Sequence, residues 1–392
     1  MNILIISTEY PPYLFGGGGA FAHALATSLA LKGHRVIVVS RGPETRYVTS
    51  EGVRILRVKS PEIKPRHFWF QVRAAPIVKR LLDRGLVDVV HANSFSGGII
   101  FQLLKNTVRG KPPPMIVTVH GYPRHYLHIS LHSAKLRANM GEIATYLASY
   151  PSWDALLAKE VHTANAVVSV ARFLAEDIVR DYKADPSKVY HIPNSVDTDY
   201  IERSTRLCQY NFGKCDVAAG GRFFYTKGLH LIPLVAKYLT GNGSKTRFCV
   251  FGEGPYRVIA EQLARRLGVH SMVEFLGRLP RREALCVMKH SKLLFLPSLY
   301  EIMPVTLLEA AALGKPIVAL RAPYSIELVE SGFNILLAST IREAASLIAH
   351  VLAGEDYKKA AVENIRLVSE KYSASRMAES YLNLYRKLQE DR

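Results

Sequence analysis

Two glutamates, Glu301 and Glu309, stand eight residues apart around a predicted helix start. The apolar run at 293–296 predicts a strand before them, so Glu301 falls in a loop and Glu309 inside the helix. Pro304 is typical of a first helical turn, where a missing N–H costs nothing. Free backbone amides at such a start favour an anionic or hydroxyl-rich ligand. The alternative is a solvated carboxylate pair on a capped helix.

Two cations, Arg222 and Lys227, follow the predicted strand at 215–219. A helix is expected to begin near Thr226, which places both cations at a strand end beside a helix N-terminus. An arginine grips phosphate oxygens with a planar fork, and a lysine adds a point charge. The pattern therefore indicates a diphosphate site, and the alternative is two surface cations beside a loop.

A glycine-rich loop joins the first predicted strand to the first predicted helix, and it contains Gly16 and Gly17. Glycines allow backbone amides to approach a ligand closely. The loop is not a dinucleotide fingerprint, because the spacing is too long and no acid ends the next strand. It is not a Walker A loop either, since no G-K-[ST] follows. A plain flexible loop is the alternative.

Three further candidates follow predicted strands. His120 comes directly after the strand at 115–119, where it could hydrogen-bond a sugar hydroxyl or a departing phosphate, although a lone histidine of this kind is more often structural. His91, after the preceding strand, is a weaker candidate. Gly252 and Leu279 follow two strands of the second half, and each is a weak signal alone.

These candidates depend on short β-branched runs that alternate with helix-length amphipathic segments, the pattern of a parallel sheet with helices on both faces. The pattern restarts after about residue 210. The predicted strands are 3–6, 35–40, 53–58, 87–91, 115–119, 166–169 and 188–192, then 215–219, 246–251, 272–275, 292–296 and 316–319. Helices are expected at 20–32 and 374–389 and from about Gly228, Pro255, Arg281 and Pro304. Open parallel sheets bind ligands at the carboxyl ends of their strands, so a cleft between the two halves is the expected site.

Composition allows two domains, since the chain has 392 residues of which 48% are hydrophobic. No apolar run approaches the roughly 18 residues of a membrane-spanning helix. The first residues read as a buried strand rather than a signal peptide. The four cysteines lack zinc-ligand spacing, and we expect free thiols in a reducing cytoplasm, with a Cys208–Cys215 bridge as the alternative.

The net charge of +18 is unevenly distributed, because residues 52–141 carry 15 Lys and Arg against three acids. Six of the fourteen histidines and several aromatic residues share this segment. Such a basic, aromatic-bearing region suits an anionic membrane surface or a phosphorylated acceptor. No nucleic-acid motif is present, so we expect no nucleic-acid partner. The alternative is charge that serves solubility alone.

Taken together, these motifs resemble the retaining glycosyltransferases of family 4, also called glycosyl transferases group 1. Residues 301–309 resemble the E-x7-E signature of that family, and residues 221–228 its G-R-x-x-x-x-K-G element. Residues 11–17 resemble its P-P-x-x-x-G-G loop, 192–197 its I-P-N-G-V-D stretch, and 275–280 the segment that faces the base. The resemblance covers most of the chain and is strongest over 215–334.

Departures from the family pattern lie near the expected sugar and the domain hinge. Ile302 replaces a common glycine, Ser195 replaces the glycine of I-P-N-G-V-D, and residues 321–324 replace a frequent Gly-Gly. These changes bear on the donor sugar more than on the class of reaction.

The resemblance implies an α/β protein of GT-B architecture, with two Rossmann-like doubly wound parallel-sheet domains facing across a cleft. The expected domains are an acceptor-side domain at 1–193, a nucleotide-sugar-binding domain at 194–371, and a C-terminal helix at 372–392 that packs back on the first domain. The implied activity is a metal-independent hexosyltransferase that moves a sugar from a nucleotide diphosphate to a hydroxyl of a glycan, a lipid-linked acceptor or a small sugar, with retention. The uracil base and glucose are favoured by the family, and guanine and adenine stay open.

The resemblance also assigns roles to residues. Arg222 and Lys227 would stabilise the leaving diphosphate, Glu301 would bind sugar hydroxyls, and His120 would assist at the reacting face. The donor side is expected to comprise Gly16, Gly17, Gly252, Leu279, Met303, Pro304, Val305 and Glu309. No cofactor and no metal are expected, because the two cations take the place of a metal ion. We expect a cytoplasmic protein, peripheral on the membrane. The alternatives are a nucleotide-sugar epimerase and a non-catalytic nucleotide-sugar-binding protein on the same fold.

Overall fold

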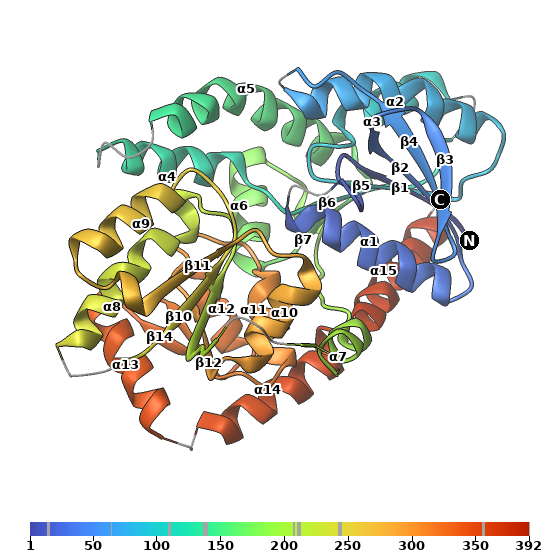
Figure 1. Cartoon of the computed structure of the whole chain (residues 1–392). Helices are drawn as coiled ribbons and strands as arrows, with labels where there is room; N and C mark the ends of the chain where they lie inside the picture. Colours follow the sequence, from blue (N-terminus) through green and yellow to red (C-terminus); the bar gives the residue numbers. More distant parts are fainter. Residues whose placement is uncertain are drawn as a thin grey trace. The chain divides into compact units, whose positions relative to one another are not determined.

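Two compact units make up the chain, and each is described by itself (Figure 1). Unit 1 comprises Met1–Leu131, Ile143–Ser195 and Ala374–Arg392, and unit 2 comprises His132–Glu142 and Val196–Ser373. The computed structural model describes residues 1–13, 16–63, 65–108, 111–135, 140–206, 208–209, 213–241, 245–354 and 357–391.

An eight-stranded sheet forms the centre of unit 1, in the order β3-β4-β2-β1-β5-β6-β7-β8. The strands are β1 (Asn2–Ser7), β2 (Arg35–Gly42), β3 (Arg46–Ser50), β4 (Val53–Lys59), β5 (Val89–Asn93), β6 (Met115–Val119), β7 (Ala166–Ser169) and β8 (Val189–His191). All neighbours are parallel except β3, which pairs antiparallel with β4. The predicted parallel sheet is confirmed, and β3 is an additional edge strand whose five residues are all exposed.

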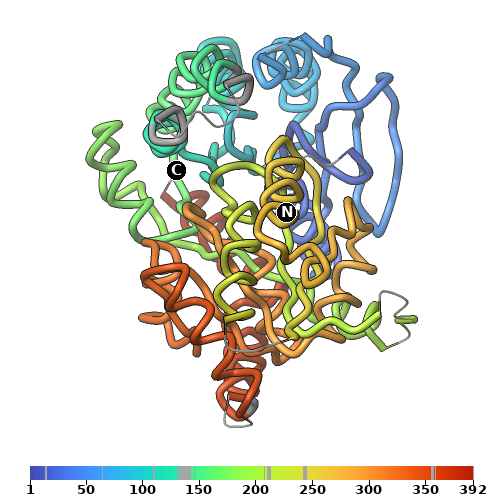
Figure 2. Tube along the Cα trace, turned by 60° about the vertical axis from the view of Figure 1, so that its left-hand side comes forward, coloured from blue at the N-terminus to red at the C-terminus, as the bar shows by residue number. Residues whose placement is uncertain are grey.

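Helices of unit 1 cover this sheet. They are α1 (Gly17–Leu31), α2 (Arg66–Asp83), α3 (Gly98–Thr107), α4 (Pro123–Lys135), α5 (Met140–Thr163), α6 (Arg172–Tyr182) and α15 (Ala374–Glu390), with a 3-10 turn at Pro186–Lys188. The first and last helices pack together against one face, where Phe21 and Leu25 meet Tyr381 and Tyr385 in a shared core. Helix α2 packs on α3 and β4, and Figure 2 shows it in light blue beside the blue strands of the chain start.

Unit 2 contains a six-stranded parallel sheet in the order β11-β10-β9-β12-β13-β14. Its strands are β9 (Val217–Gly220), β10 (Phe248–Phe251), β11 (Val273–Gly277), β12 (Leu293–Leu296), β13 (Ile317–Leu320) and β14 (Leu336–Ala338). Its helices are α7 (Thr198–Arg206), α8 (Ile232–Thr240), α9 (Arg257–Arg266), α10 (Arg281–His290), α11 (Val305–Ala312), α12 (Pro323–Glu330), α13 (Ile341–Ala353) and α14 (Tyr357–Lys371). Short 3-10 turns lie at Tyr225–Lys227, Leu229–Leu231 and His270–Met272. The predicted second doubly wound domain is therefore confirmed.

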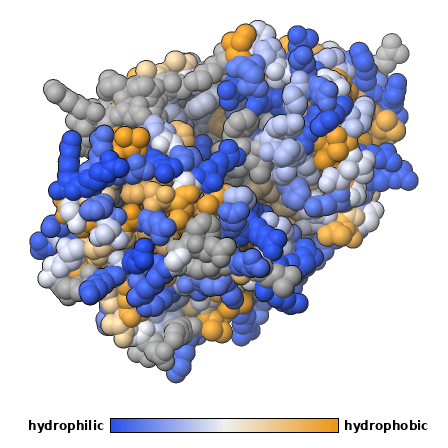
Figure 3. Space-filling model, in the orientation of Figure 1, coloured by the Kyte–Doolittle hydropathy of each residue, from blue (hydrophilic) through white to orange (hydrophobic). Residues whose placement is uncertain are grey.

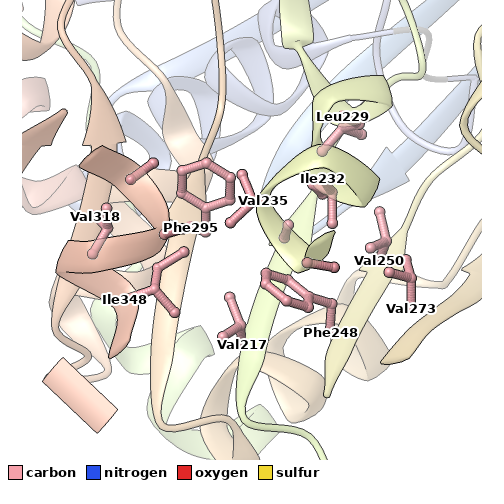
Figure 4. Close-up of a cluster of buried hydrophobic side chains, with 14 of the residues drawn as sticks. Val217, Leu229, Ile232, Val235, Phe248, Val250, Val273, Phe295, Val318 and Ile348 are labelled. Atoms are coloured by element: carbon pink, nitrogen blue, oxygen red, sulfur yellow. The ribbon is translucent and has the colours of Figure 1, made fainter. Parts of the chain in front are cut away.

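The core of unit 2 explains why these short strands suffice. Figure 4 shows Val217 of β9 and Phe295 of β12 facing Val235 of α8 and Ile348 of α13. All four side chains are completely buried. Removing apolar surface from water stabilises the fold by roughly 25 cal/mol per Å². A four-residue strand that is buried along its whole length therefore contributes as much apolar area as a longer strand with one exposed face.

The four cysteines contradict the prediction of free thiols. Cys208 is bonded to Cys286 and Cys215 to Cys249, so the alternative Cys208–Cys215 bridge is also wrong. The Cα atoms of each pair lie 5.8 Å apart, within the range of a disulfide. Each bond joins elements that are distant in the sequence, and this is why cysteine spacing alone could not identify the partners. Because all four cysteines are bonded, they no longer support the prediction of a reducing cytoplasm.

Among the described residues, no helix is both long enough and apolar enough to cross a membrane.

Candidate active site

Two glycine-containing turns of unit 2 lie against each other at the carboxyl edge of its sheet. Gly252 follows β10 with φ +129°, and a Cβ built on it would lie 1.8 Å from the carbonyl oxygen of Gly221, which follows β9. The Gly221 N–H donates to Phe251 O at 3.1 Å, and the Phe223 N–H donates to Glu253 O at 2.8 Å. Since no side chain fits between the two turns, Gly252 serves a close backbone approach that fixes the segment from residue 221 onward.

Lys227 ends the 3-10 turn that follows this approach. The next residue, Gly228, has φ +63°, and a Cβ on it would lie 1.8 Å from Pro297 O. The Thr226 carbonyl accepts from the N–H groups of Leu299 and Tyr300 at 2.8 and 3.1 Å. The turn that carries Lys227 is thereby joined to the loop after β12, the loop in which Glu301 lies.

Glu301 and Lys227 form an ion pair, in which Lys227 Nζ donates to Glu301 Oε1. Ser298 Oγ donates to the same oxygen at 3.2 Å. The two side chains are 12% and 24% exposed, so solvent screens this pair less than a surface pair. The structure therefore brings together two of the predicted catalytic residues from loops that are 74 residues apart in sequence.

Glu309 is buried inside α11 and pairs with Arg281, the first residue of α10, at 3.0 Å from Nε to Oε1. Burial raises the pKa of Glu309, and the positive charge of Arg281 together with its hydrogen bond opposes that rise. The Arg281 guanidinium also stacks over the ring of Tyr200, 4.8 Å from the ring centre. The two glutamates of the motif thus have separate cationic partners, and sequence reasoning missed Arg281.

The start of α11 differs slightly from the expectation, because Pro304 is the N-cap residue and Val305 the first helical residue. The Pro304 carbonyl accepts from the N–H groups of Leu307 and Leu308. The amides of Val305 and Thr306 precede these and have no partner within the helix. Met303 is buried at the end of the loop. The helix start therefore presents amides beside the Glu301 loop, as the motif predicted.

Arg222 is exposed, and its guanidinium lies over the Phe224 ring, 4.9 Å from the ring centre. Within the described part of the chain it has no carboxylate partner. Its positive charge is therefore available to an incoming anion, whereas the charge of Lys227 is already shared with Glu301. Leu279, half-buried between β11 and α10, follows Gly277, whose carbonyl accepts from the Gly252 N–H at 2.7 Å.

In unit 1, Gly16 is the N-cap of α1 and Gly17 its first residue. A Cβ on Gly17 would meet no atom within 4 Å, so this helix start is sterically open. The amides of the first helical turn have no intrahelical partner. Residues 14 and 15, which belong to the predicted loop, lie outside the described residues.

His120 follows β6 as predicted, and its ring packs 4.2 Å from that of Phe21. Burial lowers the pKa of His120 to about 3, so the imidazole is neutral near pH 7. The backbone N–H of His120 donates to Ser94 Oγ at 2.6 Å, but the buried Nε2 of its ring has no hydrogen-bond partner among the described residues. A buried polar atom of this kind is rare and marks His120 as a candidate for contact with a ligand.

His91, the weaker candidate, has a structural environment. Its Nδ1 lies 2.6 Å from the Tyr385 hydroxyl and its Nε2 2.7 Å from Thr118 Oγ1. Burial lowers the pKa of His91 to about 3. Because both ring nitrogens are engaged inside the core, His91 attaches the C-terminal helix to the sheet and has no atom left for a ligand.

Glu160 is a buried carboxylate that sequence reasoning missed. It accepts the N–H groups of Phe95 and Gly97 at 2.9 and 2.7 Å, where the chain passes from β5 into α3. Burial raises the pKa of Glu160 to about 7, against the lowering effect of these backbone hydrogen bonds. The carboxylate therefore holds the loop at the carboxyl end of β5, and its place in the last turn of α5 gave no sequence signal.

Two family sequence profiles match most of the chain. The profile described as Glycosyl transferases group 1 matches residues 213–368, which lie in unit 2. The profile described as Glycosyltransferase Family 4 matches residues 15–200, most of them in unit 1. The first match contains Arg222, Lys227, Glu301 and Glu309, and the second contains His120.

Proteins that are similar to this chain over nearly its whole length have names that agree with these two profiles. A glycogen synthase of Mycobacterium tuberculosis is 26% identical over 95% of this chain and 91% of its own length. An uncharacterized glycosyltransferase of Methanocaldococcus jannaschii is 26% identical over 98% of both chains. The fold is similar to that of sucrose-phosphate synthase from Thermosynechococcus elongatus, with a TM-score of 0.76 at 18% identity over 100% of this chain and 99% of the other. The chain therefore belongs to the group 1 glycosyltransferases and has the GT-B fold.

Proposed function

We propose that the protein transfers a hexose from a nucleotide-diphosphate sugar to an acceptor hydroxyl, with retention of configuration and without a metal. The observation that carries this proposal is the arrangement of charge at the carboxyl edge of unit 2. Lys227 is paired with Glu301, whereas Arg222 stands nearby in sequence, exposed and without a carboxylate partner in the described part of the chain. Arg222 supplies the fork and Lys227 the point charge for a leaving diphosphate, which is the largest electrostatic task of this reaction.

The two glutamates would take separate parts of the donor. Glu309, held by Arg281, accepts hydrogen bonds from the ribose hydroxyls. Glu301 accepts from the sugar hydroxyls through the lone pairs that Lys227 and Ser298 leave free. The amide of Val305 adds a donor, and Gly252, Leu279, Met303 and Pro304 provide the close backbone approach and the apolar contacts beside it.

The chemical step would break the bond between the anomeric carbon and the diphosphate oxygen. The acceptor oxygen then forms its bond to the same face of that carbon, and the acceptor proton passes to the leaving diphosphate. In unit 1, neutral His120 offers Nε2 to a hydroxyl, and the amides near Gly16 and Gly17 are open to a phosphate. No protein nucleophile is required by this scheme.

The donor base is proposed to be uracil and the sugar glucose, on the family preference alone. Acceptor classes that fit are a glycan, a lipid-linked acceptor and a small sugar. An epimerase would convert the donor without any acceptor, and a non-catalytic binder would not need two cations and two carboxylates together. Glycosyltransferase relatives along the whole chain favour transfer over both alternatives.

The donor test is a thermal-shift and hydrolysis screen of UDP-, GDP- and ADP-sugars, with added Mg²⁺ or Mn²⁺ and with a chelator. We expect one nucleotide series to stabilise the protein and to be hydrolysed slowly in the presence of the chelator. Arg222→Met should abolish the shift, and Lys237→Met, an exposed lysine on α8, should keep it as a control of equal charge change. Absence of stabilisation by every nucleotide would reject the proposal, and activity that needs the metal would reject its metal-independent part.

We also propose peripheral contact with an anionic membrane on the cytoplasmic side through unit 1. Helix α2 carries exposed apolar side chains at Phe68 and Val72, one turn apart, together with the cations Arg66, Arg73 and Arg80. Not every basic residue of 52–141 contributes, because Arg57 is buried and hydrogen-bonds the carbonyl of Tyr10. Co-sedimentation with phosphatidylglycerol vesicles, but not with phosphatidylcholine vesicles, is the expected result, and equal binding to both would contradict it.

A further inference from the structure

A pocket of about 580 Å³ opens in unit 1 beside α2, apart from the site residues named above. It lies at the carboxyl end of β4, where Lys59 is paired with Gly42 at the end of β2, and beside the start of the antiparallel strand β3. Its volume falls within the range of small-molecule sites. Figure 3 shows mainly hydrophilic side chains over the region of α2 and β3, with single hydrophobic ones among them.

Four polar residues line this pocket, and their groups are suited to an anion. Lys59 is the last residue of β4 and Arg73 lies in α2, and both side chains are exposed. Ser60 is only 9% exposed, yet its hydroxyl has no hydrogen-bond partner. Thr45 Oγ1 accepts from the Lys59 N–H at 3.1 Å, so its own hydroxyl hydrogen is left for another acceptor.

No carboxylate lines the pocket among the residues that the structure describes. The adjacent Glu62 is engaged elsewhere, by Arg41 at 2.7 Å and by Arg66 at 3.4 Å. Lys59 and Arg73 have no acidic partner in the described part of the chain. Two unpaired cations and an unsatisfied buried hydroxyl in one concavity are an electrostatic arrangement that a bound anion would complete.

We propose that this pocket binds the phosphate of a phosphate ester carried by a sugar or polyol. Arg73 would hold two phosphate oxygens with its fork, Lys59 would add its charge, and the hydroxyls of Ser60 and Thr45 would donate to the remaining oxygen. The apolar part of the wall is formed by Val58, Pro61 and Ile77. It suits the C–H face of a sugar or polyol ring better than a second charged group.

This binding does not depend on the proposed nucleotide site, because none of the residues that line the pocket is assigned to the donor. Two sources can present the same phosphomonoester: a soluble sugar phosphate, or a lipid whose inositol headgroup carries a phosphate monoester. Either would make the protein selective for phosphorylated molecules. If the bound ester is also the acceptor, that further step rests on the proposed transferase function.

The test is isothermal titration calorimetry with glucose 6-phosphate, with glucose and inorganic phosphate as partial ligands. The full-length protein is compared with Lys59→Met, Arg73→Met and the double variant. Lys79→Met, also on α2 but outside the pocket and paired with Asp83, is the control with the same charge change. Each single variant should weaken binding about tenfold or more, the loss expected for one charged hydrogen bond. Lys79→Met should stay within about twofold of the wild type, as a surface change outside the site should.

The second arm replaces glucose 6-phosphate with phosphatidylcholine vesicles that contain phosphatidylinositol 4-phosphate, and phosphatidylglycerol vesicles of equal charge are the control for the membrane contact proposed for α2. Loss of binding to the phosphatidylinositol 4-phosphate vesicles alone in the double variant assigns the pocket to the lipid headgroup, and loss of sugar phosphate binding assigns it to the soluble ester. The proposal is overturned if the wild type binds neither probe at millimolar concentration, or if the double variant binds both as the wild type does. It is also overturned if Lys79→Met weakens binding equally, because nonspecific charge would then explain the result.

The same variants separate this proposal from the proposed function. Lys59→Met and Arg73→Met should leave the thermal shift by the nucleotide unchanged, since neither residue is among those proposed to bind the donor. A failed nucleotide screen with intact sugar phosphate binding would reject the transferase mechanism and keep the pocket. The reverse result would reject the pocket alone.

Discussion

Replacing Lys227 by methionine separates the two tasks that the structure gives this residue. The substitution keeps the aliphatic stem and removes the ammonium group, which pairs with Glu301 and is proposed to meet the diphosphate during transfer. Methionine fills a similar volume, so we expect little repacking around the stem. The two lost interactions can then be measured separately, one by unfolding and one by turnover.

The loss of stability follows from the burial of the pair. Exposed ion pairs contribute about 0.2–1 kcal/mol, and breaking a fully buried pair costs about 3–5 kcal/mol. Glu301 is 12% exposed and keeps Ser298 as a donor, and Lys227 is 24% exposed, so the pair lies between these limits. We expect the variant to lose about 1–3 kcal/mol of unfolding free energy. For a unit of this size that is a melting point lower by about 3–10 °C.

The loss of turnover should be larger. Removing one preorganised donor from a developing negative charge costs about 3–4 kcal/mol, a fall in kcat of about 100- to 1000-fold. The assay is nucleotide release with the donor identified by the screen, measured at a temperature at which both proteins are folded. Lys237→Met serves again as the control, since it has the same charge change on the exposed face of α8.

The double variant Lys227→Met/Glu301→Gln provides the decisive comparison. The glutamine removes the carboxylate that Lys227→Met leaves buried without its cation, so the melting point should recover most of its loss. Turnover of the double variant should lie far below that of Glu301→Gln alone, because the diphosphate then lacks the lysine. If the double variant turns over as fast as Glu301→Gln alone, Lys227 serves only to hold Glu301 and the proposed role on the diphosphate is refuted. A folded single variant with unchanged turnover would refute it as well.

Three further outcomes are expected. The double variant Cys208→Ser/Cys286→Ser should lower the unfolding free energy by about 4 kcal/mol, because the disulfide closes a loop of 78 residues in the unfolded chain. Denaturant unfolding measures this loss. Four titratable thiols in the native oxidised protein would contradict the assignment of the disulfides. Burial lowers the pKa of His91 to about 3, below its unfolded value of about 6.5. The contribution of the neutral ring to stability is therefore present above pH 6.5 and falls with acidification by about 1.4 kcal/mol per pH unit. His91→Gln should reduce this slope in unfolding measured from pH 7 to 5, and an unaltered slope would contradict a buried, neutral His91. Gly252→Ala should abolish the nucleotide-induced thermal shift, because the added Cβ would overlap Gly221 O. Gly17→Ala should leave the fold intact, because a Cβ there meets no atom within 4 Å. A normal thermal shift in Gly252→Ala would refute the close approach of the two turns.

The sequence predicted the parts of the fold that repeat a strong local pattern. Buried parallel strands such as β6 and β7 are apolar along their length, and their observed bounds agree with the prediction. Strand β3 was not predicted, because every residue in it is exposed and its pairing depends on the neighbouring β4. Helix α7 was not predicted either, because its apolar face is short and depends on packing against α10 and α11.

The sequence could predict where the site residues lie, but not which side chains form ion pairs with each other. Strand-end residues converge because parallel strands end on one edge, so Lys227 and Glu301 could be placed in one site from sequence alone. Their direct ion pair depends on how two loops meet, and so does the pair of Glu309 with Arg281, 28 residues away. The local signal that existed for Arg281 was its position at the first residue of a helix that follows a strand of the same sheet.

The Cys208–Cys286 disulfide bears on donor binding as well as on stability, because it holds the helix that carries the partner of Glu309. Arg281 is the first residue of α10, and Cys286 lies five residues later in the same helix. Cys208 and Tyr200 hold α10 from the α7 side, one by the covalent bond and the other by its ring under the Arg281 guanidinium. Since burial raises the pKa of Glu309, its ionised form depends on the charge of Arg281. A displaced α10 would therefore weaken the Glu309 carboxylate as a hydrogen-bond acceptor before unit 2 unfolds. Reduction of the Cys208–Cys286 disulfide should lower the affinity for the donor at temperatures at which the protein remains folded.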